Sequence, residues 1–487
     1  MDVTTDHERR RIITAALLLG MFLAALDVLV VAPAMPSVVA DLGGLPLYPW
    51  VFSAYLLAST VTAPIFGRLA DTYGSKRFYL LGLGLFLLGS ASAGAAPNMG
   101  VLVAMRAVQG LGAGALISIT LTIVGDLYPL RDRARVQGLF SSVWGVASVI
   151  GPPVGGALVQ HLGWRSVFYL NVPFALAAAW LVARRLDEPA RDGRARSFDV
   201  LGALALAAGM SLALAALQDV GQSAGAVHTR VATLAVAGAG LLALFVWRER
   251  RAAEPLVDPT LFRNRLFLAA NAGGFLGFGA LYAASAYVPL LVRGVRDGSP
   301  QAAGLALTPL SLGWVVAAVV GGRLMLTMGY RLTAGVGTLL IAAGSAGLAR
   351  LPAASGDLHL YSTLAVIGAG MGLAMTGFIV AVQGAAPPGR MGIATSSVQF
   401  FRSLGGAVGV AVHGAVMLGI LGAGVGETGS LMEIGEAAGV QSIQPAALMT
   451  ALHGVFVAGF LFALAAVPAG FAMPGGRPET HAHASRR

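Results

Sequence analysis

Residues 12–33 read IITAALLLGMFLAALDVLVVAP, an apolar run with a single charged side chain, Asp27. A helix needs about 20 such residues to cross the hydrocarbon core of a bilayer. A carboxylate inside that core costs roughly 2.5–3.5 kcal/mol on insertion scales, and such acids usually face a protein-lined interior where they often carry protons. Asp27 is therefore a candidate proton-binding group, and the alternative is a buried polar pair with a structural role only.

The composition of the whole chain indicates an all-α integral membrane protein. Of its 487 residues, 56% are hydrophobic and only 11% are charged. The 66 glycines are typical of membrane helices that pack closely together. The chain has no cysteine, which excludes disulfide bonds, thiol chemistry and metal sites built from cysteine.

Fourteen apolar stretches are long enough to span a membrane, so the sequence predicts 14 transmembrane helices. Removing any one span would move every later loop to the opposite side of the membrane. The distribution of positive charge between the two sides, described next, therefore supports the number of fourteen spans. The predicted spans lie near residues 12–38, 50–70, 78–96, 100–124, 136–159, 166–184, 199–217, 230–247, 266–292, 302–325, 332–350, 358–383, 394–422 and 446–472.

Basic residues give the orientation. With the amino terminus in the cytoplasm, 25 of the 32 lysines and arginines lie in cytoplasmic segments, five lie outside, and Arg106 and Arg402 fall within spans. This distribution follows the positive-inside rule and predicts a multi-pass protein of the cell membrane with both termini in the cytoplasm. The net charge of +10 then reflects topology and contact with anionic lipids, and not binding to nucleic acid.

Two motifs occur twice in the chain. Residues 67–77 (GRLADTYGSKR) and 322–331 (GRLMLTMGYR) share several residues in register, 255 positions apart. Residues 107–114 (AVQGLGAG) and 365–372 (AVIGAGMG) align with an offset of 258. Two repeated motifs with nearly the same offset predict two homologous halves, an architecture whose substrate sites lie at the interface between repeats.

The duplication predicts the domain organisation, with two inserted helices between two six-helix bundles. The predicted segments are a cytoplasmic amino terminus (1–11), a first six-helix bundle (12–184), cytoplasmic connections with a two-helix insertion (185–265), a second six-helix bundle (266–472) and a disordered cytoplasmic tail (473–487).

Five segments resemble motifs of the major facilitator superfamily. Residues 67–77 look like its signature loop, residues 106–114 like its fourth-helix arginine motif, and residues 145–156 like its fifth-helix antiporter motif. Residues 164–173 and 399–406 are similar to segments of its fourteen-helix drug:proton antiporter branch. The resemblance covers essentially the whole chain and implies two six-helix bundles with two extra helices and a proton-coupled transport activity.

The resemblance also implies that the first of these loops latches the two halves together in one access state. An Asp–Arg contact that breaks when the halves rock supplies a difference in free energy between the states, and only such a difference can bias them. The alternative is a turn whose charges fix the topology. The expected latch residues are Gly67, Asp71, Gly74, Lys76 and Arg77, with Asp126 in the nearby cytoplasmic charge cluster.

The fifth-helix motif has a physical interpretation of its own. Several glycines on one helical face let a neighbouring backbone approach closely, and prolines permit a kink. A bent, close contact between the halves would seal one side of the pathway, and the alternative is ordinary helix packing. The residues concerned are Gly145, Gly151, Pro152, Gly155 and Gly156.

Arg106 is the natural partner for Asp27. By helix rise, Asp27 lies roughly 16 Å from the outer end of its span and Arg106 roughly 9 Å, a difference that an arginine side chain can largely bridge. A neighbouring guanidinium favours an ionised carboxylate, whereas desolvation favours a protonated one. The alternative for Arg106 is a structural anchor to backbone carbonyls. Other candidates to line a substrate cavity are Gln109, Trp144, Asn171, Tyr282, Gln399 and Arg402.

These features predict a proton-coupled antiporter that exports amphipathic or lipophilic small molecules. The glycine-rich run at 110–114 lacks the lysine of a nucleotide loop and lies within a span, so ATP is not the energy source. The alternatives are a dedicated exporter of one metabolite, siderophore or lipid and, less favoured, a receptor or enzyme on the same fold. We expect a monomer whose partners are its substrate, protons and membrane lipids, with no cofactor and no metal.

Overall fold

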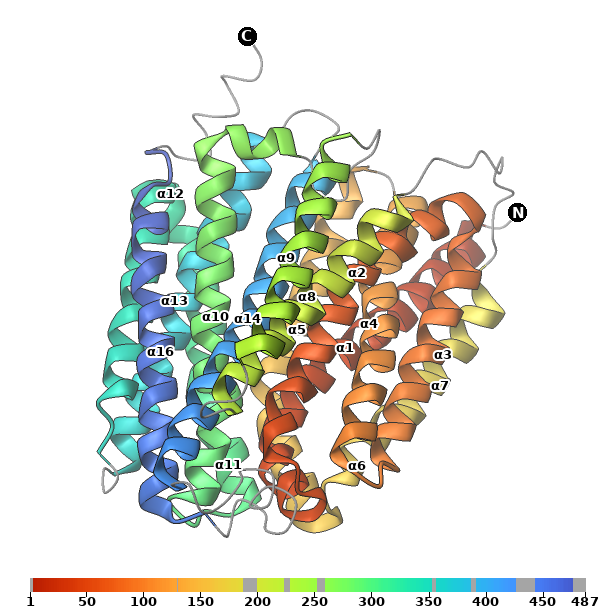
Figure 1. Ribbon diagram of the computed structural model, residues 1–487. Helices are drawn as coiled ribbons and strands as arrows, with labels where there is room; N and C mark the ends of the chain where they lie inside the picture. Colours follow the sequence, from red (N-terminus) through yellow and green to blue (C-terminus); the bar gives the residue numbers. More distant parts are fainter. Residues whose placement is uncertain are drawn as a thin grey trace.

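The computed structural model of the protein is an all-helical bundle (Figure 1). It describes residues 3–128, 130–186, 199–222, 228–251, 259–352, 356–386, 391–425 and 443–475. Within these ranges, twelve helical stretches are long and apolar enough to cross a membrane. The protein is therefore an all-helical, multi-pass membrane protein, as its composition predicts.

Several helices begin with a side-chain cap. Asn98, Asn264 and Ser299 each accept a hydrogen bond from a backbone N–H in the first turn of the helix that follows. The helices are α1 (Val3–Leu42), α2 (Tyr48–Tyr73), α3 (Ser75–Gly94), α4 (Met99–Leu127), α5 (Leu130–Leu162), α6 (Arg165–Tyr169), α7 (Asn171–Arg185), α8 (Val200–Gln222), α9 (His228–Glu249), α10 (Arg265–Gly294), α11 (Pro300–Ala306), α12 (Thr308–Ala349), α13 (Asp357–Ala385), α14 (Met391–Val425) and α16 (Pro445–Phe471), with 3₁₀ turns η1 (Leu45–Leu47) and η2 (Pro259–Arg263).

The count of twelve stretches differs from the fourteen predicted spans at two places. Pro300–Ala349 forms one continuous stretch of 50 residues, where the sequence predicts spans at 302–325 and 332–350. This stretch contains a break, because Gly329 in α12 has φ 79° and ψ 174°. The apolar part of α8, Leu201–Leu217, is shorter than the other spans.

Glycine contacts show the same packing in both halves. A Cβ atom at Gly110 of α4 would collide with the carbonyl oxygen of Tyr55 in α2, and one at Gly368 of α13 would collide with that of Leu310 in α12. Tyr55 and Leu310 are 255 positions apart, which is also the offset between the repeated motifs at 67–77 and 322–331. The repeated glycines therefore perform one task twice, which is to bring two backbones into direct contact.

The neighbouring glycines extend this correspondence to the third helix of each half. A Cβ atom at Gly112 would collide with backbone atoms of Phe86 in α3, and one at Gly370 with those of Ile341 in the second part of α12. Phe86 and Ile341 are again 255 positions apart. Gly74, between α2 and α3, and Gly329, at the break in α12, also share this spacing and both have positive φ. The break at Gly329 is thus the counterpart of the turn between α2 and α3.

Helices α8 and α9 pair with each other and lie along the junction of the two halves, where α8 packs against α14 and α2. Leu57 of α2, Leu206 and Met210 of α8 and Ala411 of α14 share one buried apolar cluster. Asp199 joins the pair, since its carboxylate accepts hydrogen bonds from Gly202 N and Arg248 Nε. In Figure 1 the pair crosses the front of the bundle.

The two ends of the bundle differ. Helix α1 begins and α16 ends at the upper end in Figure 1, whereas the short helices α6 and α11 lie at the opposite end. The start of α1 and the end of α16 thus lie on the same side of the bundle, as an even number of spans requires.

Glycine substitutions test the close helix contacts. Gly112→Ala should lower the stability of the detergent-solubilised protein by about 1–3 kcal/mol, because the added methyl group meets backbone that no rotamer change can move. Gly84→Ala, on α3 with no atom within 4 Å of the added carbon, should instead stabilise by about 0.5–1 kcal/mol through helix propensity. Thermal unfolding followed by circular dichroism measures both. Equal midpoints for the two variants would contradict the packing described above.

Candidate functional site

Asp27 lies at the centre of a buried polar cluster that we call the Asp27 cluster. Its side chain is fully buried on α1. Arg106 Nη1 donates to Asp27 Oδ2 at 2.5 Å, and Gln109 Nε2 and Asn171 Nδ2 donate to Oδ1 at 2.8 and 3.0 Å. The carboxylate is thus held by side chains from two further helices, α4 and α7.

Asn171 is positioned by a second hydrogen bond. Its Nδ2 also donates to Ser90 Oγ of α3 at 3.0 Å, and Ser90 Oγ donates to the carbonyl oxygen of Phe168 at 2.7 Å. The residue stands at the first position of α7, so the start of that helix is attached to α1 and α3 together. Sequence reasoning did not select Ser90, because one serine in an apolar span has no distinguishing pattern.

Arg106 is anchored on three sides in addition to its contact with Asp27. Its Nη1 donates to Gln109 Oε1 at 2.7 Å, its Nε donates to the carbonyl oxygen of Val51 at 3.2 Å, and its guanidinium lies 4.2 Å from the ring centroid of Tyr55. The two alternatives that the sequence leaves open, a partner for Asp27 and an anchor to a backbone carbonyl, are therefore both present.

The energetics of the Asp27 cluster follow from its burial. Two charges removed from water are stable only with close geometry and further hydrogen bonds to the remaining polar atoms. Charge-assisted bonds of this length are among the strong ones, and Gln109 and Asn171 supply the extra donors. Losing one member of such a pair leaves the other charge uncompensated, which typically costs about 3–5 kcal/mol.

Gln109 and Asn171 were expected on the wall of a substrate cavity, yet both side chains are fully buried against Asp27. Tyr282 of α10, in the other half of the protein, is also buried. Its ring also packs on Gly406 of α14, where an added Cβ would lie 2.7 Å from Cε2.

The remaining cavity candidates lie elsewhere. Trp144 on α5 is partly exposed and Gln399 on α14 is exposed, and within the described residues neither is hydrogen-bonded to the Asp27 cluster. Arg402 on α14 is partly exposed and lies over the ring of Phe278, 4.4 Å from its centroid.

Glycines of the fifth-helix motif bring α5 onto α1 beside Asp27. A Cβ added at Gly151 would lie 2.8 Å from Cβ of Leu29, and a Cβ added at Gly155 would lie 2.7 Å from the carbonyl oxygen of Val30. These two contacts lie two and three residues after Asp27 on α1. Gly145 is different, because its nearest neighbour would be Val315 at an ordinary 3.8 Å.

The next glycine faces the other half of the protein. A Cβ at Gly156 would lie 2.6 Å from the carbonyl oxygen of Pro300 and 3.0 Å from Gln301 Cα in α11. In return, a Cβ at Gly304 of α11 would collide with the carbonyl group of Pro152. The two halves are therefore in backbone contact at the end of the bundle opposite the termini.

The expected latch is described only in part. Gly74 adopts φ 111° in the turn between α2 and α3, and Gly67 faces Ser118 of α4. Lys76 is partly buried and Arg77 is exposed. The side chains of Asp71 and Asp126 lie outside the described part of the structure, so the latch contact stays a prediction.

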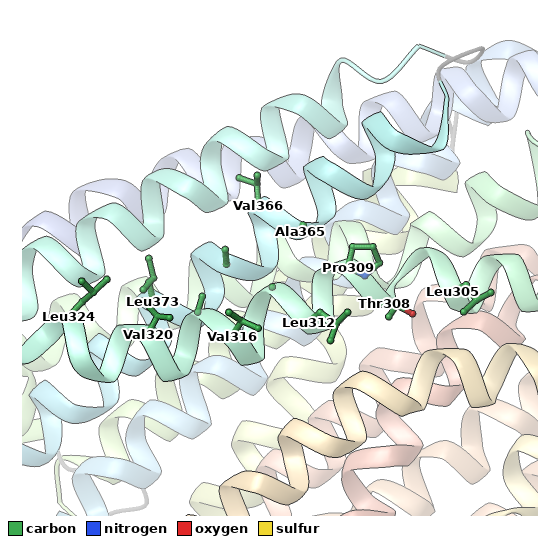
Figure 2. Close-up of a pocket in the computed structure, with 13 residues that line it drawn as sticks. Leu305, Thr308, Pro309, Leu312, Val316, Val320, Leu324, Ala365, Val366 and Leu373 are labelled. Carbon is green, nitrogen blue, oxygen red and sulfur yellow. The ribbon is translucent and has the colours of Figure 1, made fainter.

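A separate apolar groove of about 810 Å³ runs along α12 and α13 (Figure 2). Its wall includes Leu312 and Val316, which are 45% and 61% exposed, and Thr308 is its one polar side chain. No member of the Asp27 cluster lines it. The groove is therefore almost entirely apolar and separate from the Asp27 cluster.

A helical membrane bundle with a duplicated architecture and a buried acid–base pair inside its first half is typical of a membrane transporter. The sequence model of the Major Facilitator Superfamily matches residues 17–410. The chain therefore belongs to that superfamily, whose members are transporters and not enzymes.

Similar proteins agree with this assignment. Multidrug transporter protein MdtP of Bacillus subtilis (strain 168) is 36% identical over 412 residues, which are 84% of this chain and 76% of that protein. Multidrug resistance protein 3 of the same organism is 32% identical over 86% of this chain and 82% of its own length. A crystal structure of a bacterial homologue of the human lysosomal transporter Spinster, inward-facing and unoccupied, has a TM-score of 0.66 at 17% identity and 98% coverage of both chains, which shows the shared fold.

A double-mutant cycle tests the coupling of the buried pair. Asp27→Asn and Arg106→Gln should each destabilise the protein by about 3–5 kcal/mol, because each leaves one charge unpaired. The double variant should be clearly more stable than the sum of the single effects predicts. Denaturation in detergent measures the three variants against the parent. Strictly additive effects would show that the two side chains act independently.

Proposed function

We propose that this protein is a proton-coupled antiporter that exports amphipathic or lipophilic small molecules by alternating access. The observation that carries the proposal is the fully buried carboxylate of Asp27, bonded to Arg106, Gln109 and Asn171. The names of the similar proteins, a multidrug transporter and a multidrug resistance protein, support export of small molecules.

The proton acts through the bonds that Asp27 makes. In its ionised form the carboxylate accepts from two other helices, α4 and α7. A proton on Asp27 removes the negative charge that Arg106 faces, and it weakens the hydrogen bonds that the carboxylate accepts from Gln109 and Asn171. The protonated and ionised forms therefore favour different packing of α1 against α4 and α7, which is the differential free energy that alternating access requires.

Helix α5 transmits this change to the contact between the halves. Its glycines touch α1 at Leu29 and Val30, next to Asp27, and its Gly156 touches α11 in the other half. A shift of α1 thus reaches the junction through one helix. We assign to the fifth-helix motif the role of a seal that closes one side of the pathway while the other side is open.

The complete topology that we propose has fourteen spans. The break at Gly329 divides α12 into counterparts of α2 and α3, and α8 with α9 forms a pair between the halves. This gives six-helix bundles at 12–184 and 266–472 and a two-helix insertion within 185–265, the organisation of the drug:proton antiporter branch. The positive-inside rule places both termini in the cytoplasm, where the 67–77 loop would act as the latch.

Removal of the carboxylate tests proton coupling. Asp27→Asn should reduce substrate efflux driven by a pH gradient to the level of protein-free liposomes, because the variant cannot exchange a proton at this position. Efflux of fluorescent dyes, lipids and metabolites from proteoliposomes under an imposed gradient is the measurement, and the range of substrates separates a multidrug exporter from a dedicated one.

The matched control is Asp41→Asn, which removes an acid from the same helix. Asp41 is about half exposed and pairs with Arg165 at 2.7 Å near the end of α1, away from the Asp27 cluster. This variant should keep most of the gradient-driven efflux. Wild-type efflux by Asp27→Asn would remove Asp27 from the coupling mechanism.

Enlarging a glycine tests the seal. Gly156→Leu should abolish net transport while the protein still folds, because its side chain would collide with the backbone of α11 whenever this end closes. Gly145→Ala, where the nearest atom would be 3.8 Å away, should transport at close to the normal rate. Both are assayed as initial efflux rates per molecule of purified protein. Transport by Gly156→Leu at the normal rate would assign the motif to ordinary packing.

A further inference from the structure

Arg402 is a partly exposed cation within a membrane-spanning helix, and the proton mechanism does not use it. It lies on α14 about eleven residues from the start of that helix, hence roughly 16 Å along it. Its Cγ packs against Gly274 of α10, and its guanidinium lies over Phe278, one turn further along α10. Its Nε is buried and has no hydrogen-bond partner within the described residues.

The depth of Arg402 restricts what its exposed part can face. A charged side chain inside a membrane is stable only against protein, water or a ligand, and such residues usually mark a substrate pathway. Arg402 is partly exposed. Because a guanidinium exposed to hydrocarbon would be strongly unfavourable, its exposed part faces an aqueous or ligand-filled space.

The charged residues near Arg402 determine the net charge around the space that it faces. Asp27 is already paired with Arg106 at 2.5 Å, so these two charges compensate each other. Arg402 forms no ion pair with any carboxylate of the described residues. The interior of the protein at this depth therefore has an excess positive charge, and an acidic ligand group is the species that would compensate it.

The surroundings of Arg402 suit the apolar part of such a ligand. Phe278 makes an edge contact with Trp314 of α12, with 5.8 Å between ring centroids. One turn further on α10 lies Tyr282, which packs on Gly406 of α14. Phe278, Trp314 and Tyr282 thus supply aromatic surface beside and beyond the cation along α10.

We infer that Arg402, stacked on Phe278, is an anion-binding subsite, and that the exported substrates include molecules with an aromatic or aliphatic body and one acidic group such as a carboxylate, sulfonate or phosphate. This inference rests on the proposed export function and specifies the substrate class. The acidic group accepts hydrogen bonds from the guanidinium, including the unpartnered Nε, and the apolar body lies against Phe278 and Trp314.

Two dyes with the same skeleton test the subsite. 1-Anilinonaphthalene-8-sulfonate carries a sulfonate that N-phenyl-1-naphthylamine lacks, so the pair isolates the acidic group. Binding of each dye to purified protein in lipid nanodiscs is measured by equilibrium dialysis against empty nanodiscs. Arg402→Gln should weaken binding of the sulfonate by about tenfold or more, as expected for loss of a charge-assisted bond, and should change binding of the neutral dye less than about twofold.

Two further variants make the result specific. Arg402→Lys keeps the charge without the planar fork and should retain part of the sulfonate affinity. Arg350→Gln removes an exposed arginine with the same change in net charge and should leave binding of both dyes unchanged. Equal losses for the two dyes, an unchanged sulfonate affinity in Arg402→Gln, or no binding of the sulfonate to the parent protein would each overturn the subsite.

The binding measurement also separates this inference from the export function. If sulfonate binding depends on Arg402 while no pH gradient drives efflux of either dye, the subsite stands and the antiport proposal fails. If efflux is driven by the gradient but binding does not distinguish the dyes, antiport stands and the anion subsite fails. Asp27→Asn should abolish driven efflux and keep the preference for the sulfonate.

Discussion

The structure depends on the free energy of burying one carboxylate far from water. Asp27 is fully buried, and a lone carboxylate there would not remain ionised without compensation. The protein supplies that compensation from three directions, with a guanidinium from Arg106 and amide donors from Gln109 and Asn171. Because these donors belong to α4 and α7, the ionisation of one group in α1 is tied to the arrangement of three helices. The same requirement explains why Arg106 has its own anchors, the carbonyl oxygen of Val51 and the ring of Tyr55.

The two halves share their packing but differ in their polar residues. Gly110 and Gly368 bring corresponding helices into backbone contact, so the scaffold repeats. The first half holds the buried pair Asp27 and Arg106, whereas the second half carries Arg402, which lies partly exposed over Phe278. In the function that we propose, the first half therefore carries the proton-binding group, and the second half is free to bind a substrate.

Close glycine contacts connect the helix that carries Asp27 to the junction between the halves. Gly155 packs against Val30, three residues from Asp27, and the adjacent Gly156 packs against α11. Neighbouring residues on one helix therefore touch both α1, the helix that carries Asp27, and the opposite half. Interfaces without side chains between them cannot deform gradually, because backbone atoms in contact have no rotamers to change. Such a contact suits a junction that is either closed or open.

The sequence by itself determined the class of protein, the duplicated scaffold and the pair Asp27 and Arg106. Charged residues inside apolar spans are rare because they are costly, so they stand out without any structure, and repeated glycines keep their spacing because backbone contact admits no other residue. The described helices form twelve apolar stretches where the sequence predicts fourteen spans, in part because Gly329 interrupts α12 without ending it. Only the tertiary structure decided that Gln109, Asn171 and Ser90 join Asp27, and that Gly156 meets Pro300 across the junction. Those contacts depend on which faces of distant helices meet, and the packing of the whole bundle sets that choice, because a membrane helix shows little periodicity when both its lipid-facing and buried sides are apolar.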